Sequence, residues 1–190
     1  MTNKLLFFVL LALCFSGCDM LETHPYDVHI TGERELTNKN IQLIENKMQG
    51  KKTIRFAMIS DTQRWYNSTE DVVKALNARG DIDFVIHGGD QSDFGVTKEF
   101  IWMRDIFNKF QMPYVCLLGN HDCLGTGEDA YRAIYGDPNF AFTAGNVRFI
   151  CLNTNAMEYD YSEPVPDFNF IENELNNPVS YTHLTLPTTS

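Results

Sequence analysis

Short apolar runs alternate with amphipathic segments through the middle of the chain. Three runs rich in β-branched and aromatic residues, at 54–60, 82–86 and 114–118, have the pattern of strands buried on both faces. Two segments with apolar residues at helical spacing, at 68–79 and 97–110, separate these runs. Strand, helix, strand, helix and strand in this order predict a parallel sheet with right-handed crossovers.

Local signals mark the expected ends of two helices. Ser68 and Asp71 resemble a capping box with Asp in place of Glu, and Gly80 stands where a C′ glycine would end that helix. The same signals predict a later helix that is capped by Thr126 and ends at Gly136. The residues expected to face the core are Val72, Val73 and Leu76 in the first helix, and Phe100, Met103, Phe107 and Phe110 in the helix at 97–110.

The flanking segments add further expected elements. Apolar residues alternate at 26–30 and predict a strand, whereas the spacing at 41–48 and 168–175 predicts short helices. Residues 140–143 and 147–153 predict a hairpin, because the Ala-Gly-Asn sequence between them is turn-forming.

Polar residues follow each of the three central runs. The motifs are D-T-Q at 61–63, G-G-D-Q-S-D at 88–93 and G-N-H-D at 119–122. The carboxyl ends of parallel strands meet at one edge of an open sheet, where such sheets place their sites. Each motif alone is compatible with a solvated turn or a capped loop. Three of them at equivalent strand ends predict a metal site with oxygen and nitrogen ligands.

In this order the three motifs resemble those of the calcineurin-like metallophosphoesterase superfamily, over about residues 53–176. The resemblance implies an α/β fold, a two-sheet α/β/β/α sandwich whose second sheet begins with the strand at 147–153. It also implies a metal-dependent hydrolase of phosphomonoesters or phosphodiesters with two divalent metal ions. By the resemblance, Asp61 and Gln63 bind the first metal, Asp90 bridges both, Asn120 binds the second, and Asp93 holds His121 beside the phosphoryl group.

The expected mechanism follows from the chemistry of a metal pair. Two ions ~3.5–4 Å apart clamp a phosphoryl group and lower the pKa of a bridging water, and the resulting hydroxide attacks phosphorus in line. His121 would donate a proton to the leaving oxygen, while Asp93 would raise the pKa of His121 and hold its tautomer.

One position departs from the resembled pattern. Gln63 stands where the family usually carries His, and its neutral oxygen favours Mn, Fe or Mg over Zn at that position. The alternative interpretation is a relative that binds metal or phosphate without turnover, and Gln63 is the feature that suggests it.

The C-terminal residues add another alternative. Residues 179–190 carry no charge and resemble the translated end of a transposon adapter used in sequencing libraries. We therefore expect a non-native tail, a metallophosphoesterase domain truncated to 51–178, and no metal ligand at His183. The family's later lone His and G-H-x-H are missing, so this chain itself is expected to be an inactive fragment.

The N-terminal residues have the pattern of an export signal. Residues 1–17 combine Lys4, an apolar run and small residues, and the run is shorter than the ~20 residues of a membrane-spanning helix. Their ending resembles a bacterial lipobox, which implies lipidation of Cys18, a membrane anchor and an exported cell-envelope lipoprotein. A plain secretory signal with an incidental cysteine is the alternative. Residues 18–50 form a polar N-terminal segment that precedes the predicted domain.

Charge and cysteine content narrow the function further. The net charge of −10 over 190 residues disfavours nucleic acid as a partner, because phosphate backbones require a basic surface. Cys116, Cys123 and Cys151 cannot all pair with one another, and we interpret them as buried thiols. Cys123 lies near His121, but we regard a catalytic nucleophile there as the weaker interpretation.

Overall fold

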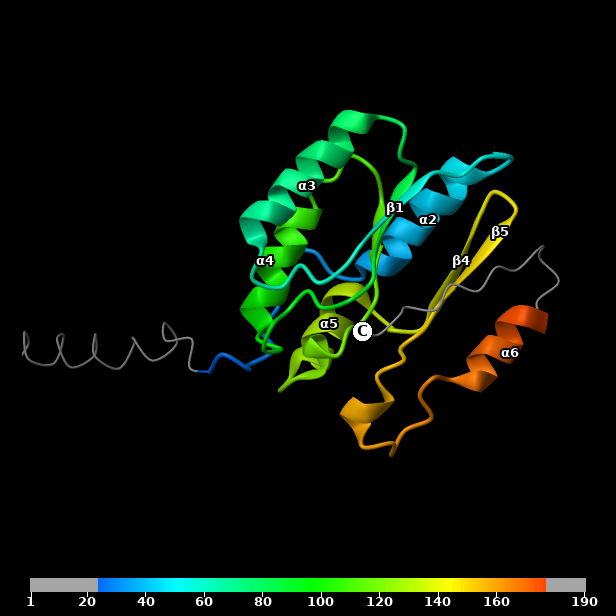
Figure 1. The fold of residues 1–190 in the computed structure, drawn as a ribbon. Helices are drawn as coiled ribbons and strands as arrows, with labels where there is room; N and C mark the ends of the chain where they lie inside the picture. The colour runs from blue at the N-terminus through cyan, green and yellow to red at the C-terminus, as the bar shows by residue number, and fades with distance from the viewer. Residues whose placement is uncertain (1–23, 177–190) are drawn as a thin grey trace, which may run out of the picture.

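The computed structural model describes residues 24–176 (Figure 1). The predicted signal peptide, Cys18 and the tail at 179–190 lie outside this range. None of the helices within the described range has the length and hydrophobicity to cross a bilayer. The elements are α2 (Leu36–Met48), β1 (Phe56–Ile59), α3 (Tyr66–Arg79), β2 (Phe84–His87), α4 (Thr97–Phe107), β3 (Tyr114–Cys116), the 3₁₀ turn His121–Cys123, α5 (Gly127–Tyr135), β4 (Phe140–Ala144), β5 (Val147–Cys151), the 3₁₀ turn Ala156–Tyr159 and α6 (Phe168–Asn176).

The three predicted central strands form one parallel sheet in the order β1-β2-β3. Val85 of β2 pairs with Ala57 on one side and with Tyr114 on the other. All four residues of β2 are buried, as the run of apolar residues predicts. The predicted hairpin is also confirmed, since β4 and β5 pair antiparallel and form a second sheet.

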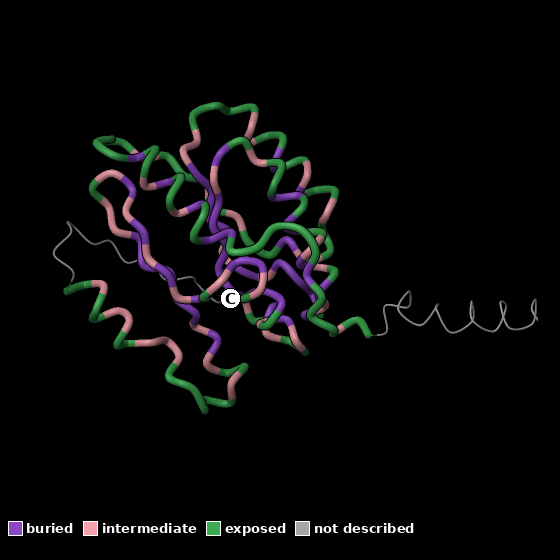
Figure 2. The backbone as a smooth tube through the Cα atoms, turned by 180° about the vertical axis from the view of Figure 1, so that it is seen from behind, coloured by how far each residue is buried: buried purple, intermediate pink, exposed green. Residues whose placement is uncertain are grey.

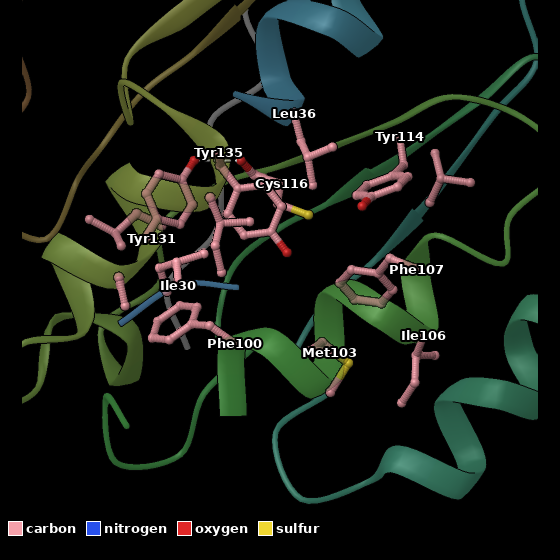
Figure 3. Close-up of a cluster of buried hydrophobic side chains, with 14 of the residues drawn as sticks. Ile30, Leu36, Phe100, Met103, Ile106, Phe107, Tyr114, Cys116, Tyr131 and Tyr135 are labelled. Atoms are coloured by element: carbon pink, nitrogen blue, oxygen red, sulfur yellow. Dashed lines mark hydrogen bonds between the residues drawn. The ribbon is translucent and has the colours of Figure 1, made fainter. Parts of the chain in front are cut away.

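Successive side chains of β2 point to opposite faces of the sheet and so enter two different cores. Val85 packs into a core formed largely by α3, α4 and α5, which Figure 3 shows from close by. Phe84 and Ile86 pack into a second core, against α2 and the hairpin β4–β5. The helices α3 and α4 therefore cover one face of the parallel sheet, and α2 and the second sheet cover the other (Figure 1).

Aromatic rings join the two sheets. The ring of Phe84 lies edge-on to Phe142, with centroids 5.6 Å apart, and edge-on to Phe149 at 5.5 Å. Phe142 and Phe149 stack on each other with centroids 4.8 Å apart. These contacts give the two-sheet arrangement that the sequence predicts.

The burial pattern separates this packed unit from the C-terminal helix. Figure 2 shows buried stretches along the central strands, whereas α6 has no buried residue. An ion pair between Arg148 and Glu174 connects α6 to β5. Cys116 and Cys151 are buried free thiols, as predicted, whereas the free thiol of Cys123 belongs to a residue that is only half-buried.

The start of α3 differs from the prediction. The helix begins at Tyr66, and its N-cap Trp65 makes no side-chain cap. Ser68 therefore lies inside the first turn, and the predicted capping box does not form. The Trp65 N–H donates to the Thr62 carbonyl at 3.0 Å, so the polar loop after β1 leads directly into the helix. The predicted end is confirmed, because Gly80 adopts the left-handed conformation with φ 67°.

Residues 26–30 do not form the predicted strand. Their backbone carbonyls accept hydrogen bonds from side chains at the starts of helices, since Thr97 donates to Asp27 and Thr126 donates to Tyr26. Because the Thr126 hydroxyl donates to Tyr26, it does not cap the N-terminus of α5 as predicted. The helix α5 nevertheless begins and ends where the sequence predicts. α4 ends at Phe107 rather than at 110, and turns with i→i+3 hydrogen bonds follow it.

The joint between the sheets provides a test of the fold. Phe142 is completely buried, so Phe142→Ala is expected to lower the free energy of unfolding by about 3–5 kcal/mol through lost packing and a cavity. Phe168→Ala is the control, because Phe168 is 68% exposed and its loss is expected to cost no more than about 0.5 kcal/mol. Urea denaturation of both variants measures the difference. Equal losses would contradict this account of the core.

Buried His87 predicts a pH dependence of stability. Gly89 N–H donates to its Nδ1 at 3.2 Å, and burial lowers the pKa of His87 to about 3, so the folded protein keeps it neutral. The unfolded chain takes up this proton below about pH 6.5, so folding stability is present above that pH and is lost as the pH falls, by up to ~1.4 kcal/mol per unit. His87→Asn keeps an acceptor for Gly89 without the titration. Its unfolding free energy should fall less steeply than that of the wild type between pH 6.5 and 4, and parallel curves would refute the assignment.

Candidate metal centre

The three predicted motifs meet at the carboxyl edge of the parallel sheet. The Asp61 N–H donates to the Gly89 carbonyl at 3.1 Å, so the loop after β1 is bonded to the loop after β2. The Asp90 carboxylate accepts the His121 N–H at 3.0 Å, which connects the loop after β2 to the loop after β3. The structure therefore brings together residues that are up to 60 positions apart in the sequence, as the parallel arrangement predicts.

Asp122 connects the loop after β2 to the loop after β3. Its side chain is fully buried, and its Oδ1 accepts the N–H groups of Gln91 and Ser92 at 2.9 and 2.8 Å. Its Oδ2 accepts the N–H groups of Asp90 and Gly119, each at 3.0 Å. Burial raises the pKa of Asp122 to about 7, and the N–H donors oppose this rise by stabilising the carboxylate.

Two glycines allow the loops to approach this closely. A Cβ atom at Gly119 would lie 2.1 Å from Oδ1 of Asp90, and one at Gly89 would lie 2.7 Å from the Cα of Gly119. Because no side chain fits at either position, the backbone itself forms the wall against which the Asp90 carboxylate is placed.

Backbone strain concentrates in the same loops. Asp61, Arg64 and Asp90 adopt left-handed conformations, with φ of 55°, 66° and 61°. Such conformations cost non-glycine residues about 1–3 kcal/mol each and persist where surrounding contacts impose them, often at functional sites. Here the Asp90 carbonyl accepts the N–H groups of both Thr62 and Gln63, which fixes the loop around Asp61.

His121 is oriented by Asp93, although mainly through the backbone. The Nδ1 atom of His121 lies 3.0 Å from the Asp93 carbonyl oxygen and 3.8 Å from its carboxylate Oδ1. A carbonyl oxygen can only accept, so Nδ1 carries the proton and Nε2 is left to face other partners. This hydrogen bond raises the pKa of His121, and the charges of Asp90, Asp93 and Asp122 raise it further.

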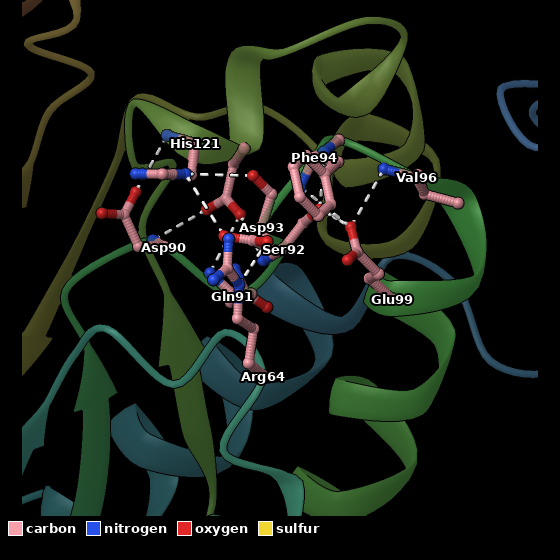
Figure 4. A network of polar contacts seen from close by, with 11 residues as sticks. Arg64, Asp90, Gln91, Ser92, Asp93, Phe94, Val96, Glu99 and His121 are labelled. Atoms are coloured by element: carbon pink, nitrogen blue, oxygen red, sulfur yellow. Dashed lines mark hydrogen bonds and ion pairs between the residues drawn. The ribbon is translucent and has the colours of Figure 1, made fainter.

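Asp93 also binds a residue that the motifs do not include. The side chain of Asp93 is 4% exposed, and its Oδ2 accepts a short hydrogen bond from Nε of Arg64. Figure 4 shows Arg64 and His121 approaching Asp93 from different sides. The guanidinium of Arg64 also lies over the ring of Phe94, 5.4 Å from its centroid.

The oxygen donors at this edge fit divalent cations. Asp61 and Asp90 form no ion pair with Lys or Arg in the described part of the chain, and burial raises the pKa of Asp90, with Asp61 adding to the rise. Oε1 of Gln63 is buried without a hydrogen-bond partner among residues 24–176, a costly state that a bound cation would relieve. Asn120 is exposed at the start of the turn His121–Cys123.

The donor set is rich in amides rather than histidines. Within residues 24–176, no three His, Cys, Asp or Glu side chains converge in a geometry that could hold a metal ion by themselves. A cation site at this edge would therefore need the amide oxygens of Gln63 and Asn120 in addition to the carboxylates of Asp61 and Asp90.

Three side chains that hold the loops of the site in place were not identified from the sequence. Asp122 belongs to a recognised motif, but only the fold shows that it organises the loops. Arg64 follows D-T-Q directly, and Glu99 accepts the Phe94 and Val96 N–H groups of the loop before α4. The sequence signal for Arg64 was its position next to the D-T-Q motif, whereas no signal in the sequence indicated Glu99. Burial raises the pKa of Cys123 to about 12, so its thiol is not a competing nucleophile.

Comparisons with known proteins identify similar folds and the family of the chain. A solved purple acid phosphatase, PPD1 from seeds of yellow lupin (Lupinus luteus), is similar in fold, with a TM-score of 0.52 at 16% identity. The match covers 72% of this chain and 30% of the lupin protein. No curated protein matches the chain. The family model described as calcineurin-like phosphoesterase matches residues 54–187, more than half of the sequence, and the chain therefore belongs to the calcineurin-like phosphoesterase family.

Proposed function

We propose that this site hydrolyses phosphomonoesters or phosphodiesters with the help of two divalent cations. The observation that carries the proposal is the convergence of three loops at one sheet edge, where the loop of Asp61 and Gln63 is bonded to Gly89 and Asp90, and the Asp90 carboxylate accepts the His121 N–H. Membership of the phosphoesterase family supports phosphate esters as the substrate class.

The protein groups divide into two sets of ligands. Asp61 and Gln63 would hold the first cation, Asp90 would contact both, and Asn120 would hold the second. Such a pair of cations, when bound, offsets phosphoryl charge and makes water more acidic. The donors are oxygen atoms, which favours Mn, Fe or Mg over Zn at the Gln63 position.

His121 acts on the leaving group. Its Nδ1 is engaged by the Asp93 carbonyl, so Nε2 is the atom that faces the substrate. A raised pKa keeps the ring protonated to higher pH, which suits a group that gives its proton to a leaving oxygen. Asp93 acts through His121 by fixing the orientation of the ring.

This chain supplies fewer ligands than two cations require. Its sequence contains no G-H-x-H, and His87 is buried with Nε2 2.9 Å from the Thr62 hydroxyl and is not free to bind metal. The second cation would retain only Asp90 and Asn120. We infer that the chain binds at most one Mn²⁺ and does not turn over, and that turnover would need the two histidine motifs in addition.

The location of the protein is a separate proposal. Cys18 and its lipobox-like surroundings support an exported lipoprotein that is anchored to the cell envelope by lipid on Cys18. The formal charge of the exported segment is one unit more negative than that of the whole chain, since Lys4 is the only charged residue before Cys18.

Asp90→Asn tests the metal centre. Calorimetric titration of the purified chain with Mn²⁺ is expected to show one site, and the substitution should weaken it at least ~10-fold because a charged ligand becomes neutral. In a gene product with the histidine motifs, the same change should lower kcat/KM for an aryl phosphate at least ~10³-fold.

The matched control is Asp71→Asn, because Asp71 is an exposed carboxylate on α3 paired only with Lys74. This control should leave Mn²⁺ affinity and turnover unchanged. Two tight Mn²⁺ sites in this chain, or unaltered binding by Asp90→Asn, would overturn the assignment of ligands.

Labelling tests the lipid anchor. Expression in bacteria with a labelled fatty acid should incorporate label into the wild-type protein, and Cys18→Ser should abolish it because the acceptor thiol is gone. Export of an unlabelled wild-type protein would show that residues 1–17 are a plain secretory signal.

A further inference from the structure

Arg64 is an exposed cation held in place beside an acidic site. Its side chain is 66% exposed, yet Nε bonds to the buried carboxylate of Asp93 and the guanidinium lies over Phe94. An unrestrained surface arginine would lose much conformational entropy on binding a ligand. Because two contacts already restrain Arg64, little further ordering is needed.

The bond to Asp93 leaves the rest of the guanidinium available. Only Nε is used in that bond, and the Nη1 and Nη2 groups make no hydrogen bond with any other described residue. Paired N–H donors in one plane match the oxygen atoms of a phosphate group. The left-handed backbone of Arg64, with φ 66°, adds a local strain of the kind found where a side chain must be aimed.

The position of Arg64 separates it from the reacting phosphorus. His121 and Arg64 contact different oxygens of the Asp93 carboxylate, at Oδ1 and Oδ2. The free Nη groups of Arg64 therefore lie beside the same carboxylate that neighbours the His121 ring. Arg64 is better placed for a neighbouring anionic group than for the phosphoryl group that is attacked.

We propose that Arg64 binds a second phosphate group of the substrate, so that the site prefers diphosphate esters to monoesters with an uncharged leaving group. This inference rests on the proposed phosphoesterase function. In the reaction, a water molecule releases a proton to solvent and its oxygen forms the new bond to phosphorus, while the bond from that phosphorus to the bridging oxygen breaks. The bridging oxygen leaves with the second phosphate and takes a proton from His121, while Arg64 offsets the charge of the departing group.

Ligand binding measures this preference without turnover. Titration calorimetry of the chain in saturating Mg²⁺ compares inorganic phosphate with methylenediphosphonate, a diphosphate analogue that cannot be hydrolysed. The wild type is expected to bind the diphosphonate about 10-fold more tightly, the effect of one charge-assisted hydrogen-bonded pair. Arg64→Gln should abolish the preference, and Arg64→Lys should retain part of it because the charge remains without the paired donors.

Arg79→Gln is the matched control, since Arg79 is similarly exposed at the other end of α3 and pairs with Asp81. It should leave the preference unchanged, and thermal melting confirms that each variant folds. If Arg64→Gln weakens both ligands equally, or neither, Arg64 only supports Asp93 and the inference is overturned. If the wild type binds neither ligand although Mn²⁺ still binds, the residues of this chain do not form a phosphate site and the inference about Arg64 is overturned, whereas loss of Mn²⁺ binding as well would overturn the assignment of the metal ligands.

Discussion

The arrangement of the site depends on one buried carboxylate. Asp122 accepts N–H groups from Asp90, Gln91, Ser92 and Gly119, and so joins the loops that follow β2 and β3. A fully buried carboxylate with fewer donors would be costly, and backbone N–H groups without it would lose their partners. The carboxylate and the N–H groups therefore stabilise each other, and this fixes the two loops that carry Asp90 and Asn120, two of the four expected ligands.

The charge distribution around this anchor explains where a cation belongs. The carboxylate of Asp122 is stabilised by N–H groups and that of Asp93 by Arg64. Within the described residues, Asp61 and Asp90 are left without a Lys or Arg partner; Asp61 is exposed and Asp90 is half-buried. In the same part of the chain, the side-chain oxygen of Gln63, two residues after Asp61, is buried without a hydrogen-bond partner among the described residues.

The two cores explain how a sheet of short strands holds these loops in fixed positions. β2 is buried on both faces, with Val85 in one core and Phe84 in the other, so its end cannot shift without disturbing both. β1 is less protected, and Met58 is 55% exposed. The loop after β1 relies instead on hydrogen bonds to the Gly89 and Asp90 carbonyls.

The sequence by itself determined the order of the elements from β1 to β5, the parallel sheet and the meeting of the three motifs, because apolar periodicity and glycines act locally. The strand that it predicted at 26–30 does not form. The sequence did not determine how helices begin, since Thr126 donates its hydroxyl to Tyr26, a hundred residues away, and Trp65 follows directly from a loop. It also gave no role to Asp122, Arg64 or Glu99, whose partners are brought near only by packing. Hydrogen bonds between distant segments leave no periodic trace in a sequence, and only the tertiary structure decides them.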